Sequence, residues 1–143
     1  MGKITEENRR ALENAEHYED AVLTGMINHE FTTALGQLIE QKGISVLSIV
    51  ENSNISKSYI NKLRNPSEKA VTPRRHVIID LALALDASLD ETNHLLKLAR
   101  YQELYTRDEA EALIIWGMVK ELSGKQIREM LHEKGLDRMF KEK

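Results

Sequence analysis

Residues 45–65 read SVLSIVENSNISKSYINKLRN, and they carry the clearest local signals for helix starts and ends in the chain. Ser45 is placed to cap a short helix over residues 46–52, and Ser56 is placed to cap a second helix over residues 57–64, because a serine side chain can accept a hydrogen bond from a free N–H at a helix start. Asn65 and Pro66 end the second helix, since the residue before a proline disfavours helical backbone. The stretch therefore predicts two short helices with almost no loop between them.

The apolar residues of this stretch predict how the two helices pack. Four of them would turn inward and hold the helices at a fixed angle, as in a helix-turn-helix: Ile49, Ile55, Ile60 and Leu63. The opposite face of the second helix would then present Lys57, Ser58, Tyr59, Asn61 and Lys62.

Helical patterns continue on both sides of the stretch. Thr5 can cap a helix that runs to about His29, whose thin apolar stripe suits either a solvated arm or a dimerisation helix. A helix over 32–41 would end at Gly43 in a left-handed conformation. After the stretch, Thr72 and Pro73 would open a broadly apolar helix to Leu85.

Three further helices are expected in the C-terminal third. The first covers 89–99, capped by Ser88 or Asp90. Thr106 with Glu109 forms a capping box for a helix to Leu122, which we expect to be central because Trp116, Val119 and their neighbours are apolar on several sides. Ser123 with Gln126 repeats the box for a last helix that stops at Gly135.

These elements predict an all-α fold in three parts. They are an N-terminal helix over 1–30, a helix-turn-helix unit over 31–87 and a C-terminal helical extension over 88–143 that packs on the core or forms a dimer seam. A chain of 143 residues is long enough to bury one core, and two prolines and seven glycines suit a helical bundle.

Composition also bounds the function. The absence of cysteine excludes disulfides and thiolate metal sites, and no apolar run approaches the roughly 18–20 residues of a membrane span, so we expect a soluble, cytoplasmic protein without membrane contact. The five histidines are scattered with no metal-binding pair, and no phosphate-binding glycine loop or nucleophile motif occurs. We therefore expect no metal, no cofactor and no enzyme activity.

Charge is segregated along the chain. Residues 31–75 hold seven Lys or Arg against three Asp or Glu, a net +4, whereas residues 1–30 hold three against seven, a net −4. A basic middle between acidic flanks is typical of a local phosphate-binding face.

Residues from about Thr33 to Ala87 resemble the lambda repressor/Cro-like (XRE family) helix-turn-helix regulators. The likeness rests on the succession LGQLIEQKGIS, VLSIVENSN, ISKSYINKLRN and RRHVIIDLALALD, with the family's order, lengths and apolar positions. Asn54 stands at the family's customary glycine in the turn, and Asn tolerates a left-handed backbone well.

The resemblance implies a sequence-specific regulator of transcription, which we expect to be a repressor, with helix 57–64 in the major groove of double-stranded DNA. Ser58, Tyr59 and Asn61 are the candidates for base edges, because Asn can bridge adenine N6 and N7 and Ser can bond several bases. Neutralisation of phosphates falls to Lys57, Lys62, Arg64, Arg74 and Arg75.

The family generally reads two half-sites as a dimer, so we expect a homodimer. Its seam would come from the N-terminal helix or from the C-terminal hairpins around Trp116, and the sequence leaves both open.

An alternative use of the same fold is a protein-interaction module, such as an antitoxin or adaptor, that binds a protein partner and binds DNA weakly or never. Val46 stands where the family often has a phosphate-contacting or base-contacting Gln, and the chain is acidic as a whole, at −3. Both features favour this alternative, whereas the basic segment and the outward Asn61 and Lys62 favour DNA.

Overall fold

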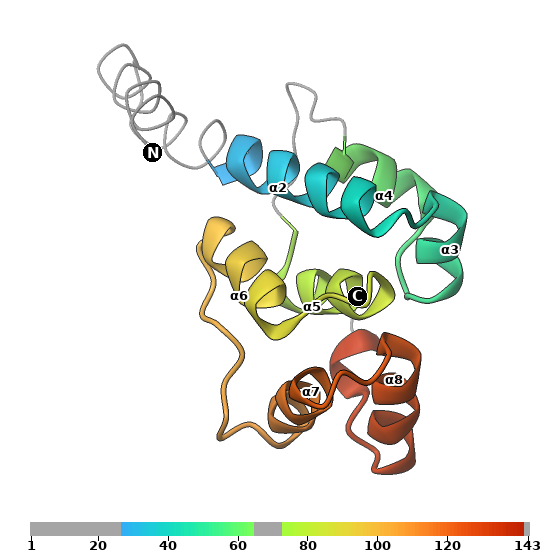
Figure 1. Cartoon of the computed structure of the whole chain (residues 1–143), viewed down its shortest axis with the longest axis vertical. Coiled ribbons are helices and arrows are strands. Elements are labelled where there is room, and N and C mark those ends of the chain that lie inside the picture. The colour runs from blue at the N-terminus through green and yellow to red at the C-terminus, as the bar shows by residue number, and fades with distance from the viewer. Residues whose placement is uncertain (1–26, 65–72, 142–143) are drawn as a thin grey trace.

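A computed structural model describes residues 27–64 and 73–141 (Figure 1). All regular structure in these residues is helical, which confirms the expected all-α class for this part of the chain. The elements are α2 (Ile27–Lys42), α3 (Val46–Glu51), α4 (Lys57–Arg64), α5 (Arg75–Ala84), α6 (Leu89–Leu98), α7 (Glu109–Val119), α8 (Gly124–Glu133) and the 3-10 helix η2 (Arg138–Lys141).

The central helix is α5. Its residues 78–84 are all buried, and it packs against α3, α6, α8 and η2. Figure 1 shows it between the pair α2 and α4 above and the pair α7 and α8 below. The expectation that the helix around Trp116 is central was wrong, because Trp116 and Val119 of α7 are 48% and 62% exposed. A helix that is apolar all round can be central, like α5, or have one face uncovered, like α7.

The first described helix is longer than expected. We predicted a break between residues 29 and 32, but α2 runs without interruption from Ile27 to Lys42. Phe31 and Leu35 lie one helical turn apart and are 1% and 0% exposed, so the buried stripe begins before the predicted start. The earlier part of the predicted helix over 5–29 lies outside the described residues.

Most of the predicted helix ends are confirmed. Ser45 accepts a hydrogen bond from the backbone N–H of Ser48, and Ser88 and Ser123 each form the reciprocal capping box with the residue three positions on. Gly43 and Gly135 follow their helices with φ of 63° and 68°, the left-handed region that glycine adopts at low cost.

Two predicted helix starts were wrong. The helix expected to open at Thr72 and Pro73 begins at Arg75, with Arg74 at the N-cap and no side-chain cap bond. The cap expected at Thr106 is supplied by Asp108, whose carboxylate accepts from the N–H of Glu111 at 2.9 Å. Asp is at least as good a cap as Thr, so the two positions compete for the helix start, and Asp108 takes it.

The start of α8 docks directly on the end of α5. The backbone N–H of Gly124 donates to the Asp86 carboxylate at 2.6 Å, and a Cβ at position 124 would lie only 1.7 Å from the carbonyl oxygen of Leu83. Only glycine allows this approach. The docking fixes the position of α8 on α5.

Within the described ranges, the buried apolar side chains form one cluster that extends from Phe31 of α2 to Phe140 of η2. It takes residues from both the predicted 31–87 unit and the predicted C-terminal extension. None of the helices in the described ranges combines the length and apolarity that crossing a bilayer requires.

Candidate nucleic-acid interface

The helices α3 and α4 pack against each other, α3 also contacts α5, and α4 also contacts α2. The four residues predicted to turn inward are all buried. Ile49 and Ile60 are fully inaccessible, and Leu63 and Ile55 are 3% and 7% exposed. The apolar contacts that hold α4 in place are therefore confirmed.

The opposite face of α4 is polar and exposed. Its members are Lys57, Ser58, Asn61, Lys62 and Arg64, which we call the α4 face. Four of them, all except Arg64, line a shallow, open depression. No hydrogen bond or ion pair joins these five side chains to residues 27–64 or 73–141, so their donors and acceptors face outward.

Tyr59 differs from the other candidates on α4. It is half-buried and packs against the core, and its backbone N–H donates to the hydroxyl of Ser56 at 3.1 Å. Burial, followed by the neighbouring Tyr101, raises the pKa of its phenol, and the opposing effect of Arg74 is smaller. Tyr59 is therefore at the edge of the α4 face.

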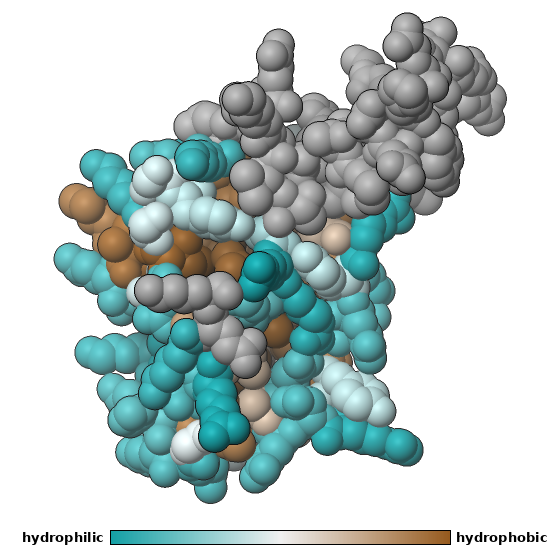
Figure 2. Space-filling view, turned by 180° about the vertical axis from the view of Figure 1, so that it is seen from behind, coloured by the Kyte–Doolittle hydropathy of each residue, from teal (hydrophilic) through white to brown (hydrophobic). Residues whose placement is uncertain are grey.

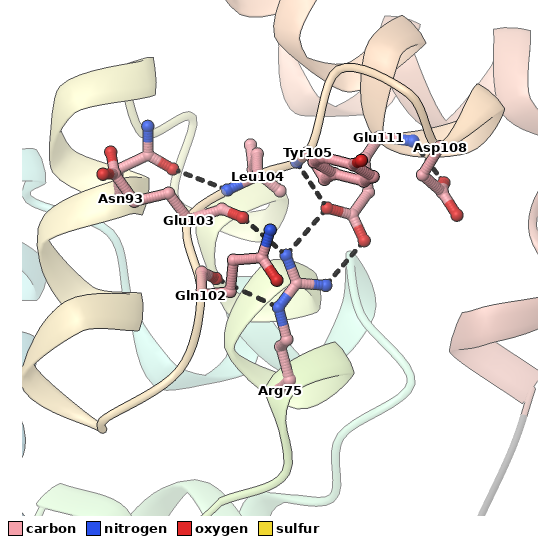
Figure 3. A network of polar contacts seen from close by, with 8 residues as sticks. All are labelled: Arg75, Asn93, Gln102, Glu103, Leu104, Tyr105, Asp108 and Glu111. Atoms are coloured by element: carbon pink, nitrogen blue, oxygen red, sulfur yellow. Dashed lines mark hydrogen bonds and ion pairs between the residues drawn. The ribbon is translucent and has the colours of Figure 1, made fainter.

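Arg75 has partners inside the protein (Figure 3). Its guanidinium forms a two-pronged ion pair with the Glu111 carboxylate at 2.6 and 2.7 Å, and it donates to the carbonyl oxygens of Gln102 and Glu103. Glu111 also accepts from the N–H of Tyr105 and raises the pKa of Arg75. Arg75 thus fastens the segment between α6 and α7 to α5, and we do not assign it to phosphate binding.

Asn54, in the connection between α3 and α4, is held by two residues that the sequence analysis did not single out. The N–H of Asn54 donates to the Asp80 carboxylate at 3.0 Å, and the Asn54 side-chain amide donates to the carbonyl oxygen of Phe140 at 2.8 Å. Asp80 is 3% exposed in the middle of α5. The α3–α4 connection is thereby tied to both the central helix and the C-terminal η2.

Asn54 does not adopt the left-handed backbone that Asn tolerates, since the non-glycine residues described with positive φ are Asp86, Arg100 and Glu121. The connection is stabilised by the polar contacts of Asn54 and not by a glycine-like conformation.

Arg128 of α8 completes this arrangement. Its guanidinium pairs with the Asp80 carboxylate, donates to the Asp80 carbonyl oxygen at 2.8 Å and lies 5.0 Å from the centre of the Phe140 ring. A buried carboxylate is costly unless it is paired, and Arg128 provides the pair. The sequence holds one signal of a buried ion pair here, since Asp80 is a lone charge within the apolar run VIIDLALAL.

No protein-family model, curated protein or solved structure matches this chain. The function must therefore be inferred from the α3–α4 pair and its surroundings.

Nowhere in 27–64 or 73–141 do three His, Cys, Asp or Glu side chains gather in a way that could hold a metal ion. His132 and Asp137 form a histidine–carboxylate contact, with 3.0 Å between Nδ1 and Oδ2 and the His132 side chain 75% exposed. Such an exposed pair is typical of a solvated surface.

Proposed function

We propose that this chain is a sequence-specific, double-stranded DNA-binding regulator of transcription of the lambda repressor/Cro-like helix-turn-helix kind, acting as a repressor, with α4 in the major groove. The observation that carries the proposal is the two-sided character of α4, in which Ile60 and Leu63 are buried while the α4 face is exposed and lacks described partners.

The dimensions of α4 suit a groove. An α-helix with its side chains is about 10–12 Å in diameter, so a major groove about 12 Å wide admits one, and the eight residues of α4 give it about 12 Å of length to lie along the groove. The same helix has Lys62 and Arg64 in its last turn.

The side chains of the α4 face divide by chemistry. Asn61 can donate to adenine N7 and accept from N6, and Ser58 can donate or accept at several base edges. Lys57, Lys62 and Arg64 would pair with phosphates, which supplies affinity and register but little sequence information. Arg74, exposed at the start of α5, remains a candidate phosphate contact, whereas Tyr59 would contribute only at the edge.

One copy of α4 offers few base contacts. We therefore include in the proposal a homodimer that reads two half-sites about one helical turn, roughly 34 Å, apart.

The test is fluorescence anisotropy with a labelled random duplex across a salt series. The test protein is Asn61→Ala, Lys62→Ala, Arg64→Ala. The matched control is Gln102→Ala, Lys125→Ala, Lys134→Ala, which removes one amide and two positive charges from exposed positions elsewhere.

The parent and the control should bind with an affinity that falls steeply with salt, because each phosphate contact releases counterions. The slope of log affinity against log salt concentration should be smaller by about two for the test protein, because Lys62 and Arg64 no longer neutralise phosphates. Equal binding by all three proteins, or no binding by any, with helicity intact by circular dichroism, would overturn the assignment of α4.

A second function is favoured by one observation. Leu47 of α3 is 63% exposed, beside half-buried Val46 and Val50. Figure 2 shows apolar surface gathered at the side of the molecule where α3 lies. An exposed apolar patch often marks a protein contact, so the alternative is an antitoxin-like or adaptor-like module. Binding of a protein there would change little with salt, in contrast to DNA binding.

A further inference from the structure

The outer face of α7 is apolar and uncovered in the described part of the chain. The helix has the sequence EAEALIIWGMV, and it buries Ala110, Ile114 and Met118 against the body of the protein. On the other side Trp116 is 48% exposed and Val119 is 62% exposed. A helix that is apolar on both sides normally has both sides covered.

The spacing of this outer face suits a second helix. Positions 109, 112, 116 and 119 follow the alternating three- and four-residue steps of a helix-helix seam. Ala112 is small and half-buried, and it lies one turn from the large, exposed Trp116.

The two ends of the face have opposite charge. Glu109 begins α7 and Lys120 is its C-cap, and both are exposed. They lie three turns apart on the same side, separated by about 16 Å along the axis, which is too far for them to pair within one chain. An antiparallel copy of the helix would bring each of them opposite its counterpart.

We propose that the α7 face, defined as Glu109, Ala112, Trp116, Val119 and Lys120, docks on the α7 face of a second copy of this chain in an antiparallel, two-fold arrangement. A crossing centred between residues 114 and 115 places Glu109 of each copy opposite Lys120 of the other. The same crossing sets each Trp116 over the partner's stretch at 112–113. Such an interface is self-complementary, as a two-fold axis requires.

The α7 pairing would be the dimer seam of the proposed regulator. Its role in DNA binding rests on the proposed function, whereas the pairing of two chains does not. One pair of 11-residue helices buries less than the standard 1,200–2,000 Å² of a tight complex. The pairing should therefore be weak in free solution, with a Kd on the order of micromolar.

The experiment is sedimentation equilibrium of the full chain without DNA, combined with tryptophan fluorescence, since Trp116 is the single tryptophan. Lys120→Glu and Glu109→Lys each turn two attractive pairs into two repulsive ones and should raise the dimer Kd about ten-fold. The double variant Glu109→Lys, Lys120→Glu should restore the parent Kd. The control Lys57→Glu makes the same charge change on α4 and should leave the Kd unchanged.

The expected result is a concentration-dependent dimer in which Trp116 emission moves to shorter wavelength as the dimer forms, with rescue by the double variant. A chain that stays monomeric overturns the proposal, as does a dimer that neither single variant weakens or one that the double variant fails to restore. A blue-shifted emission that does not change with concentration also overturns it, because the chain itself would then cover Trp116. If the parent chain forms this dimer but binds no duplex in the anisotropy experiment described above, the proposed function is refuted and the α7 pairing stands.

Discussion

The pair formed by Asp80 and Arg128 should be the most sensitive point of the α3–α4 support. Replacing Arg128 with Met leaves the Asp80 carboxylate, whose side chain is 4% exposed, without its cation. Removal of one partner from a fully buried pair costs about 3–5 kcal/mol. Because the Arg128 side chain remains 21% exposed, water can partly replace it, so we expect the lower end, about 3 kcal/mol.

Replacing Asp80 with Asn should be milder. The amide oxygen can still accept from the N–H of Asn54, and Arg128 can turn its charge toward solvent, so we expect a loss of about 1 kcal/mol. The double variant should lose less than the sum of the two single losses, with a coupling of about 2 kcal/mol, because the unpaired carboxylate is no longer present.

The assay is urea unfolding followed by circular dichroism for the parent, both single variants and the double variant. Additive losses within about 0.5 kcal/mol would refute the reasoning, because they would mean that the two side chains do not depend on each other in solution. A coupling of the expected size would confirm that the C-terminal helices stabilise the α3–α4 connection through Asp80.

Two further predictions concern packing and pH. Gly124→Ala should lower the free energy of unfolding by several kcal/mol in urea titrations, because the new Cβ would lie 1.7 Å from the Leu83 carbonyl oxygen. The control Gly36→Ala has nothing within 4 Å of its Cβ, so its free energy of unfolding should be unchanged or higher by about 0.5–1 kcal/mol. Equal effects of the two substitutions would contradict the docking of α8. Burial raises the pKa of Glu91, but hydrogen bonds from Ser88 and Lys42 outweigh burial, so the pKa in the folded protein is lowered. The stability that the ionised Glu91 contributes is therefore complete above the ordinary glutamate pKa of about 4.3, and it is lost as the pH falls through the lower folded pKa. Glu91→Gln should therefore cost less than about 1 kcal/mol at neutral pH and should make acid unfolding less steep, and an unchanged acid limb would contradict this.

The helices and the polarity of α4 could be predicted from sequence because local signals specify them. Ser45, Ser88, Ser123, Gly43 and Gly135 each act on the backbone within a few residues, so their roles do not depend on the rest of the fold. The burial of Ile60 and Leu63 likewise follows from their spacing on a helix.

The errors arose where distant contacts decide the structure. The polarity of Asn54 is evident from its type, but its partners Asp80 and Phe140 lie 26 and 86 positions away, and no local pattern identifies them. Arg75 looked like a phosphate contact because it is basic and follows the predicted DNA-binding helix. Glu111, 36 positions on, binds it instead.

The wrong prediction that α7, and not α5, is the central helix has the same cause. Both helices are apolar on several sides, so periodicity cannot say which of them is enclosed by others. The difference lies in the neighbours, since α5 is packed by α3, α6, α8 and η2 while α7 contacts α6 and α8. The uncovered face that results is the basis of the dimer proposed for α7.

The most direct test of the central claim is to select binding sites from a random duplex library with the parent and with Asn61→Ala in parallel. If α4 reads the major groove, the parent should enrich a two-fold sequence motif, and Asn61→Ala should lose the preference at one position in each half-site, with a cost of about 1–3 kcal/mol, while the remaining positions keep theirs. Failure of the parent to enrich any motif, or an identical motif from both proteins, would contradict the claim that α4 reads DNA through Asn61.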